Sequence, residues 1–248
     1  MERKDFFSEQ SKAYAAFRPT YPDALYSFIF SHLPGQTRAW DCATGNGQVA
    51  RHLAPHFTEV YATDISQAQL DQAIKAKNIF YSISAAEKTT FPDHSFDLIT
   101  VGQALHWFNL EEFYAEVRRT SKPKGLLAVW GYALLTIDPV IDNLFMDFYQ
   151  NTTGPYWDDA RRLVENQYRD IPFPFKKIPC PEFTIKVSWT LDQFAGYLSS
   201  WSATRNYIRK HGTNPVEAFT ETLKTVWKPA VVRDVTFPIF MKLGIVNP

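Results

Sequence analysis

The chain lacks most of the features that mark specialised protein classes. Its 248 residues contain only two cysteines, Cys42 and Cys180, which are too few for a disulfide framework or a structural zinc site. Lysine plus arginine equals aspartate plus glutamate at 26 each, so the basic excess typical of nucleic-acid binders is missing. No apolar run is long enough to cross a bilayer, and the opening MERKDFFSEQ has no apolar signal core. We expect a cytoplasmic monomer or weak dimer without a metal, nucleic-acid or membrane partner.

What the chain has in excess is aromatic side chains: Phe, Trp and Tyr make up 16% of it, with seven tryptophans. Apolar residues at 45% and charged residues at 21% are the balance of an ordinary globular protein. Most of the rings should therefore be core, but the excess also suits a closed apolar pocket around a small ligand. The length predicts one large domain, or one domain with an inserted cap.

Strand and helix patterns alternate over residues 36–132, after a helical pattern at 23–33. This alternation predicts a parallel, doubly wound α/β sheet with right-handed crossovers. The expected strands are 38–45, 59–66, 79–87, 96–105 and 126–132. The expected helices between them are 48–57, 67–77 and 109–121, with a turn at 122–125.

The alternation loosens after Tyr132. Segments 151–159 and 171–183 are rich in proline and aromatic residues, which favours a cap over further sheet. Two more strands are expected, 183–189 and 236–246, and Pro238 in the second implies a sheet edge or a strand end. We therefore predict a seven-stranded sheet in a single domain, residues 1–248. Its alternating α/β core is 36–132, and its cap and insert is about 150–230.

The segment WDCATGNGQ, residues 40–48, joins the first expected strand to its helix. Read from Gly45, it fits the glycine-rich loop that holds a dinucleotide. Read from Asp41, it places a carboxylate two residues before the loop, where a diphosphate at the helix N-terminus would be repelled. S-adenosylmethionine has no phosphate and carries a sulfonium and an α-ammonium, for which an acidic neighbour is favourable. No Lys or Arg lies between residues 39 and 50, and Asp64 ends the second strand as an acceptor for ribose hydroxyls.

These motifs occur in the order found in the class I S-adenosylmethionine-dependent methyltransferases, which the chain resembles over residues 40–131. DCATGNG, 41–47, is similar to the family's first motif, and YATDIS, 61–66, to its second-strand acidic motif. SAAEKTTFPDHSFDLITVGQALHWF, 84–108, resembles the adenine-side motif followed by the fourth strand. SKPKGLLAVW, 121–130, resembles the turn into strand five. Ala43 replaces the usual first glycine, a change that we expect a negative φ to accommodate.

A closer resemblance, to the trans-aconitate methyltransferase-like branch (methyltransferase type 11), uses segments 14–22, 103–108 and 201–212. It implies a Rossmann-like fold, S-adenosyl-L-methionine as the cofactor and a small-molecule acceptor. By this resemblance Tyr14 and Arg18 reach the methionine carboxylate. The other cofactor contacts that it implies are Asp41, Ala43 and Gly45 as the floor, Asp64 and Ile65 at ribose and adenine, Ala86 and Glu87 along the adenine, and Gln103 and Ala104 at the methionine end.

The acceptor side of such a fold opens directly after strand four. His106 there is either a hydrogen-bonding wall of the pocket or a catalytic general base. Trp107 and Trp201 are candidate walls, and Arg205, followed by Tyr207, is a candidate fork for an acceptor carboxylate. The favoured function is O-methylation of a small carboxylic acid. A nicotinamide-dependent oxidoreductase and a non-catalytic protein of the methyltransferase fold remain the alternatives.

Overall fold

Eight strands form one sheet in the computed structural model, which describes residues 18–248. The order is β3-β2-β1-β4-β5-β8-β6, and β7 also pairs with β8. The strands are β1 Arg38–Cys42, β2 Glu59–Asp64, β3 Ile79–Ile83, β4 Phe96–Gly102, β5 Ser121–Tyr132, β6 Lys176–Ile178, β7 Phe183–Trp189 and β8 Arg233–Ile245.

The first five strands pair in parallel, and β8 is antiparallel to β5, β6 and β7. This arrangement confirms the predicted Rossmann-like α/β fold. The sheet has one strand more than expected, because Lys176–Ile178, assigned from its prolines to the cap, pairs with the end of β8. Pro238 does not end β8 but lies inside it. It immediately precedes Ile239, which pairs with Tyr132 at one end of the ladder between β5 and β8.

The helices of the sheet region are short and are placed largely as expected. They are α2 Asp23–Phe30, α3 Gln48–Leu53, α4 Gln67–Asp71 and α5 Leu110–Thr120, with the 3-10 turn η2 at Leu105–Trp107. The helix expected over 67–77 ends at Asp71, and Ile74 beyond it is 46% exposed. The turn expected at 122–125 is a bulge inside β5, in which Lys124 has φ +61°.

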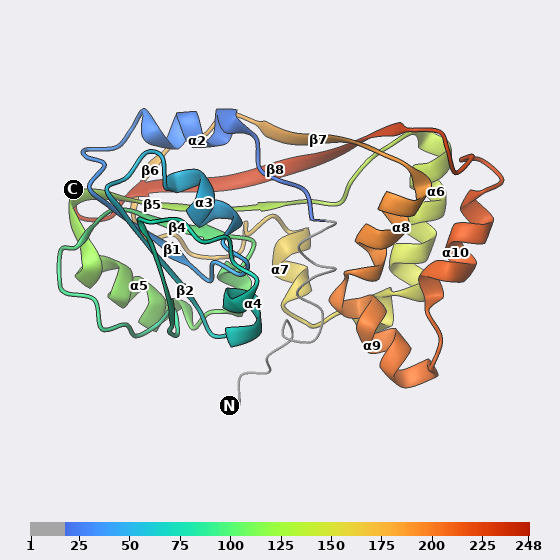
Figure 1. Cartoon of the computed structure of the whole chain (residues 1–248), viewed down its shortest axis with the longest axis horizontal. Coiled ribbons are helices and arrows are strands. Elements are labelled where there is room, and N and C mark those ends of the chain that lie inside the picture. Colours follow the sequence, from blue (N-terminus) through green and yellow to red (C-terminus); the bar gives the residue numbers. More distant parts are fainter. Residues whose placement is uncertain (1–17) are drawn as a thin grey trace.

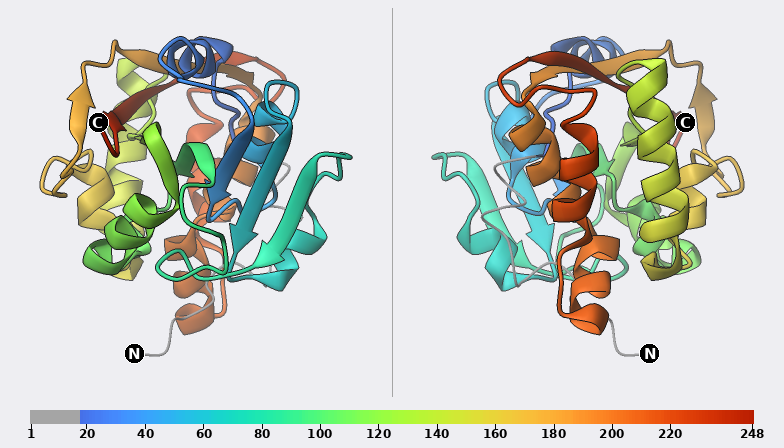
Figure 2. Two further views of the ribbon diagram at one scale, coloured as in Figure 1. Left: turned by 90° about the vertical axis from the view of Figure 1, so that its left-hand side faces the viewer. Right: turned by 90° about the vertical axis from the view of Figure 1, so that its right-hand side faces the viewer.

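A second group of helices lies at the far end of the molecule from β1–β4 (Figures 1 and 2). It contains α6 Pro139–Asp147, α8 Leu191–Ser199, α9 Ser202–His211 and α10 Pro215–Leu223. Between α6 and β6 the chain forms the π-helix η3 Phe148–Thr152, the 3-10 turn η4 Gly154–Tyr156 and the short helix α7 Arg161–Glu165. The long strands β7 and β8 run from the sheet to this helical group (Figure 1).

Alternation along the central strands divides the interior into two cores. In β1, Ala39 packs in one core and Trp40 in the other, and in β5 Ala128 and Val129 divide in the same way. Such a split is expected where successive side chains point to opposite faces of a sheet covered on both sides.

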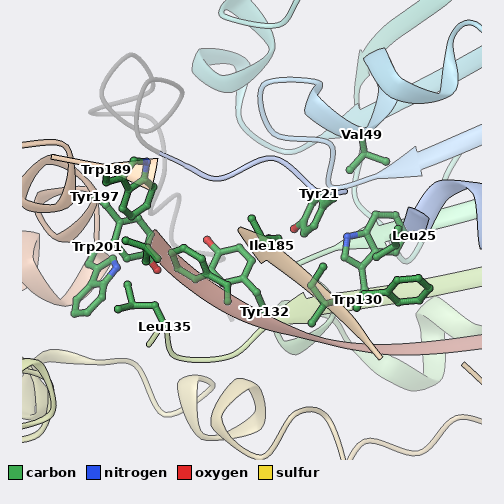
Figure 3. Close-up of a cluster of buried hydrophobic side chains, with 14 of the residues drawn as sticks. Tyr21, Leu25, Val49, Trp130, Tyr132, Leu135, Ile185, Trp189, Tyr197 and Trp201 are labelled. Carbon is green, nitrogen blue, oxygen red and sulfur yellow. The ribbon is translucent and has the colours of Figure 1, made fainter. Parts of the chain in front are cut away.

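The larger core continues out of the sheet into the helical group. Figure 3 shows this cluster running from Leu25 and Trp130 at one end, past Tyr132, to Tyr197 and Trp201 at the other. Trp130 is fully buried, and Trp201 is only 3% exposed. The helical group is therefore packed on the sheet by a continuous apolar core.

Gly131 is a position where the packing leaves no room for a side chain. A Cβ there would lie 2.5 Å from both Gln103 Oε1 and Phe240 Cζ. We expect Gly131→Ala to lower the free energy of unfolding by about 1–3 kcal/mol, as overpacking does, which urea denaturation would measure. Gly102→Ala is the matched control, because its nearest neighbour would be Val49 Cγ2 at 3.4 Å. Equal losses in the two variants would contradict the steric argument.

Candidate active site

The loop between β1 and α3 is built from residues in the left-handed region of φ. Gly45 and Gly47 have φ +57° and +79°, which glycine adopts at low cost. Ala43 has φ +55°, so the expectation of a negative φ is wrong. The loop requires this conformation because Thr44 N, next in the chain, donates to Thr63 O at 2.9 Å. The missing glycine therefore leaves local strain of about 1–2 kcal/mol.

A buried carboxylate organises this loop. Asp41 is 1% exposed and accepts hydrogen bonds from Thr100 Oγ1 at 2.9 Å, from Ala50 N at 3.0 Å and from Thr44 Oγ1. These bonds join β1 to β4, to the first turn of α3 and to the loop. Burial raises the pKa of Asp41 to about 6, and the three hydrogen bonds oppose that rise. A cationic ligand near this carboxylate would favour its charged form.

The second acidic residue also holds the loop. Asp64, at the end of β2, accepts from Gly45 N at 2.8 Å through Oδ2 and from Ser66 N at 2.9 Å through Oδ1. The next side chain, Ile65, is 45% exposed. Ala86 and Glu87 are buried, and Glu87 Oε1 accepts from Asn109 N at 3.0 Å.

Gln103 joins the ends of β4 and β5. Its backbone has φ +58°, its N–H donates to Trp130 O at 2.8 Å, and its Oε1 accepts from Tyr132 N at 2.9 Å. A left-handed glutamine directly after a central strand is a strained conformation of the kind found at functional sites. Ala104 follows it and is buried at the start of η2.

These elements enclose a first pocket, here called the loop pocket. Among residues 18–248, Arg18 is the one lysine or arginine in its lining. The residues that line it are Arg18, Pro19, Tyr21, Asp41, Ala43, Thr44, Gly45, Asn46, Gln48, Val49, Gly102, Gln103 and Tyr132. The structure thus brings the predicted residues Arg18, Asp41, Ala43, Gly45 and Gln103 together in one lining. The predicted residues Asp64, Ile65, Ala86, Glu87 and Ala104 lie outside it.

A second pocket, here called the arginine pocket, shares Arg18 and Gln103 with the first. Arg18 Nη1 donates to Tyr132 Oη at 2.6 Å, and its guanidinium lies 5.6 Å from the centre of the Tyr197 ring. Its other lining residues come from η2, from the segment around α7 and from the region of α8 and α9: His106, Trp107, Trp157, Asp158, Arg161, Tyr197, Trp201, Ser202 and Arg205. Ligands in the two pockets would meet at Arg18 and Gln103.

Arg161 is held in place by aromatic residues. Its guanidinium lies 4.6 Å from the centre of the Trp157 ring, and its Nε donates to Tyr149 Oη at 2.9 Å. Tyr149 Oη in turn donates to Glu165. No hydrogen bond or ion pair joins the terminal nitrogens of Arg161 to another residue within 18–248. A planar fork fixed in this way is suited to a carboxylate ligand.

His106 is neutral in this pocket. Burial, followed by the nearby Arg161 cation, lowers the pKa of His106 to about 3. Its Nδ1 lies 2.7 Å from Tyr168 Oη, and burial keeps the pKa of that phenol above its ordinary value. Backbone hydrogen bonds from Leu105 and His106 to Tyr168 oppose this shift. Because Tyr168 Oη accepts from the backbone, we assign its own proton to the bond with His106 Nδ1, which leaves Nε2–H as a donor.

The other predicted acceptor-side residues divide. Trp107, Trp201 and Arg205 line the arginine pocket, whereas Tyr207 does not and instead packs against Tyr156 and His211. Tyr207 faces away because it is two residues, about 200° around the helix, from Arg205. Tyr14 lies outside the described residues.

Sequence reasoning missed Asp158, Arg161 and Tyr168. The pattern of an aromatic residue followed by acidic residues and an arginine pair, 157–162, was the available signal. It carried no periodicity or motif that could distinguish it from a surface turn. Residues 18–248 hold no metal-binding group of three or more His, Cys, Asp or Glu. No helix among them is long and apolar enough to span a membrane.

Comparison with known proteins identifies relatives along the whole chain. Residues 40–129 match the model of a methyltransferase domain. A Dictyostelium discoideum protein named as a methyltransferase is 36% identical, over 97% of this chain and 94% of its own. A Saccharomyces cerevisiae protein named as an S-adenosylmethionine-dependent methyltransferase is 24% identical, over 88% of each chain. The solved structure of an Anaeromyxobacter dehalogenans methyltransferase is 36% identical with a TM-score of 0.87, covering 94% of this chain and 100% of that one.

The raised pKa of Asp41 makes a prediction about stability and pH. The folded-state pKa, about 6, exceeds the ordinary value of 3.8, so the folded protein binds this proton more tightly than the unfolded chain. The contribution of Asp41 to the free energy of unfolding is therefore largest at low pH, and it is lost as pH rises from about 4 to 6. Relative to Asp41→Asn, wild-type unfolding free energy should fall by up to about 3 kcal/mol across that interval. Urea denaturation of both proteins at several pH values measures it, and a constant difference would contradict the raised pKa.

Proposed function

The chain belongs to the class I S-adenosylmethionine-dependent methyltransferases, and from this premise we propose that it methylates a small carboxylic acid on oxygen. In this proposal the loop pocket holds S-adenosylmethionine and the arginine pocket holds the acceptor. The observation that carries it is that a pocket lined by Arg18, Arg161 and Arg205 meets the loop pocket at Gln103.

The donor set of the loop pocket fits S-adenosylmethionine. Asp41 supplies a carboxylate for the cationic end, and Arg18 a guanidinium for the methionine carboxylate. Asp64 stands next to the exposed side chain of Ile65, which suits ribose beside adenine. A dinucleotide fits less well, because its diphosphate would face Asp41, and Arg18 is the one cation that the described part of the chain contributes to the lining. The yeast relative is itself named as S-adenosylmethionine-dependent.

The arginine pocket fits an acid. The Arg161 guanidinium stacks on Trp157 and is held by Tyr149, so its side chain loses little conformational entropy when it binds a carboxylate. Trp107, Trp157 and Trp201 supply apolar walls around it. The resemblance to the trans-aconitate-like branch agrees with this acceptor class.

The chemistry requires orientation more than proton transfer. When bound, S-adenosylmethionine supplies an electrophilic methyl group that a carboxylate oxygen takes in line, without losing a proton. Arg18 and Gln103 stand where the two ligands meet, so they orient the acceptor oxygen. His106 donates through Nε2–H and does not act as a base, because a pKa of about 3 leaves it with little affinity for a proton.

The cofactor assignment is tested by calorimetry with S-adenosylmethionine, its demethylated product and NAD. We expect the first two to bind and NAD not to bind. Asp64→Ala should weaken S-adenosylmethionine binding by well over tenfold, because two ribose hydrogen bonds to a charged acceptor are each worth about 1.5–3 kcal/mol. Asp71→Ala, an exposed acid on α4, is the control and should bind normally. Binding of NAD but not S-adenosylmethionine would overturn the assignment in favour of the oxidoreductase alternative.

The acceptor assignment is tested by steady-state kinetics over a panel of small acids, phenols and amines. For an acid, Arg161→Gln and Arg205→Gln should raise KM at least tenfold, about 1.4 kcal/mol for a lost charged contact. Arg162→Gln, the exposed neighbour of Arg161 outside the pocket, should leave KM unchanged. His106→Ala should retain a rate that does not depend on pH between about 6 and 8.

The opposite pattern would identify a different acceptor. If His106→Ala abolishes a titrating limb of the pH profile while both arginine variants keep the wild-type KM, the acceptor is a phenol, alcohol or amine that needs a base. If S-adenosylmethionine binds and nothing is methylated, the non-catalytic alternative holds.

A further inference from the structure

We propose that the acceptor is a hydroxylated acid, whose hydroxyl donates to the carboxylate of Asp158 and accepts from the indole N–H of Trp157. Asp158 is then a specificity-determining residue. The inference rests on the proposed function, since it names the chemical class of acid that the arginine pocket selects.

Two polar atoms of residues that line the arginine pocket have no partner within residues 18–248. They are Asp158 Oδ2 and Trp157 Nε1, and both atoms are buried. Their residues are consecutive in the chain, and both line the pocket. Buried polar atoms are nearly always hydrogen-bonded, because removing them from water without a partner is unfavourable. An unpaired donor and an unpaired acceptor on consecutive residues of one pocket lining indicate a ligand group that satisfies both.

The local structure does not use the Asp158 side chain. Its backbone carbonyl accepts from Arg161 N at 2.8 Å in the turn that leads into α7. Its carboxylate, in contrast, caps no helix and forms no ion pair with the described residues, although Arg161 is only three positions away. Arg161 is instead drawn towards Tyr149 and Trp157. The pocket therefore presents a cation and an anion that do not neutralise each other.

This separation defines what the ligand must carry. An anionic group on the ligand would pair with Arg161, but a second anionic group placed at Asp158 would be repelled by the Asp158 carboxylate. A hydrocarbon there would leave both buried atoms unpaired. An ammonium would satisfy Asp158 but cannot accept from Trp157 Nε1, because it has no lone pair. A hydroxyl both donates and accepts, so it is the group that satisfies the two residues together.

Substrate discrimination follows from the same argument. A site built to hydrogen-bond a hydroxyl rejects the analogue that lacks it, because its own polar groups then remain unpaired. The methylated oxygen belongs to a carboxylate at the junction with the loop pocket. The hydroxyl is a recognition group and keeps its proton throughout, so Asp158 takes no part in methyl transfer.

The experiment compares acids in matched pairs that differ by one hydroxyl: malate with succinate, mandelate with phenylacetate, and 3-phenyllactate with 3-phenylpropionate. Methyl ester formation is followed by mass spectrometry at saturating S-adenosylmethionine. The wild-type protein should favour the hydroxy acid at least tenfold in kcat/KM in each pair that reacts. Asp158→Asn should reduce that preference to threefold or less, mainly through a higher KM for the hydroxy acid. Asp159→Asn, an exposed neighbour outside the pocket lining, should retain it.

A purely structural role for Asp158 is separated by thermal denaturation. Removing an unpaired buried anion should leave the Tm of Asp158→Asn equal to or above that of the wild type. Loss of a structural contact would instead lower the Tm and slow methylation of the hydroxy acid and of its deoxy analogue alike.

Equal methylation of hydroxy and deoxy acids by the wild-type protein would overturn the inference and leave the proposed function intact. A tenfold preference for amino acids that carry an ammonium in place of the hydroxyl would also overturn the inference and leave the proposed function intact. Methylation of phenols or amines, with no acid reacting, would overturn the proposed function itself.

Discussion

The buried carboxylate of Asp41 is the interaction on which the rest of the site depends. It is fully enclosed, so it is tolerated only because Thr100, Ala50 and Thr44 donate to it. Those three donors belong to β4, α3 and the loop, which are separate in the chain. The carboxylate therefore sets the path of the loop relative to the central strands. Asp64 strengthens that path from β2 through Gly45 N. With the loop so placed, the pocket that it lines has a defined floor.

A second constraint is the length of β8, which pairs with β5, β6 and β7. Because β8 extends beyond the parallel sheet, it supports the helical group on the same continuous core that contains Trp130 and Trp201 (Figure 3). The two pockets consequently share a wall at Arg18 and Gln103. Methyl transfer needs the two reacting groups in line, and under the proposed function a shared wall on the sheet would supply that alignment.

Under the proposed function, the charges of the arginine pocket would let the site select its acceptor without a base. Arg161 is held by Tyr149 and Trp157, and the same cation helps to keep His106 neutral. A neutral imidazole with a donating Nε2–H and fixed guanidinium groups favours an acceptor that is already anionic. Asp158, unpaired on the same wall, adds a requirement for a hydrogen-bond donor. Recognition and reactivity thus come from separate groups.

The sequence by itself determined the sheet, the glycine loop and the family, because these depend on local periodicity and on motifs whose residues are contiguous. It also placed Asp41, Gly45 and Gln103 at the first pocket, since each lies at the end of a central strand or in the loop that follows one. Only the tertiary structure decided that Ala43 is left-handed, because Thr44 N, next in the chain, is bonded to Thr63 O of the neighbouring strand β2. The same holds for the arginine pocket, whose walls come from η2, the α7 segment and α9. No local pattern encodes which of their side chains meet, because packing of the helical group on the core brings them together.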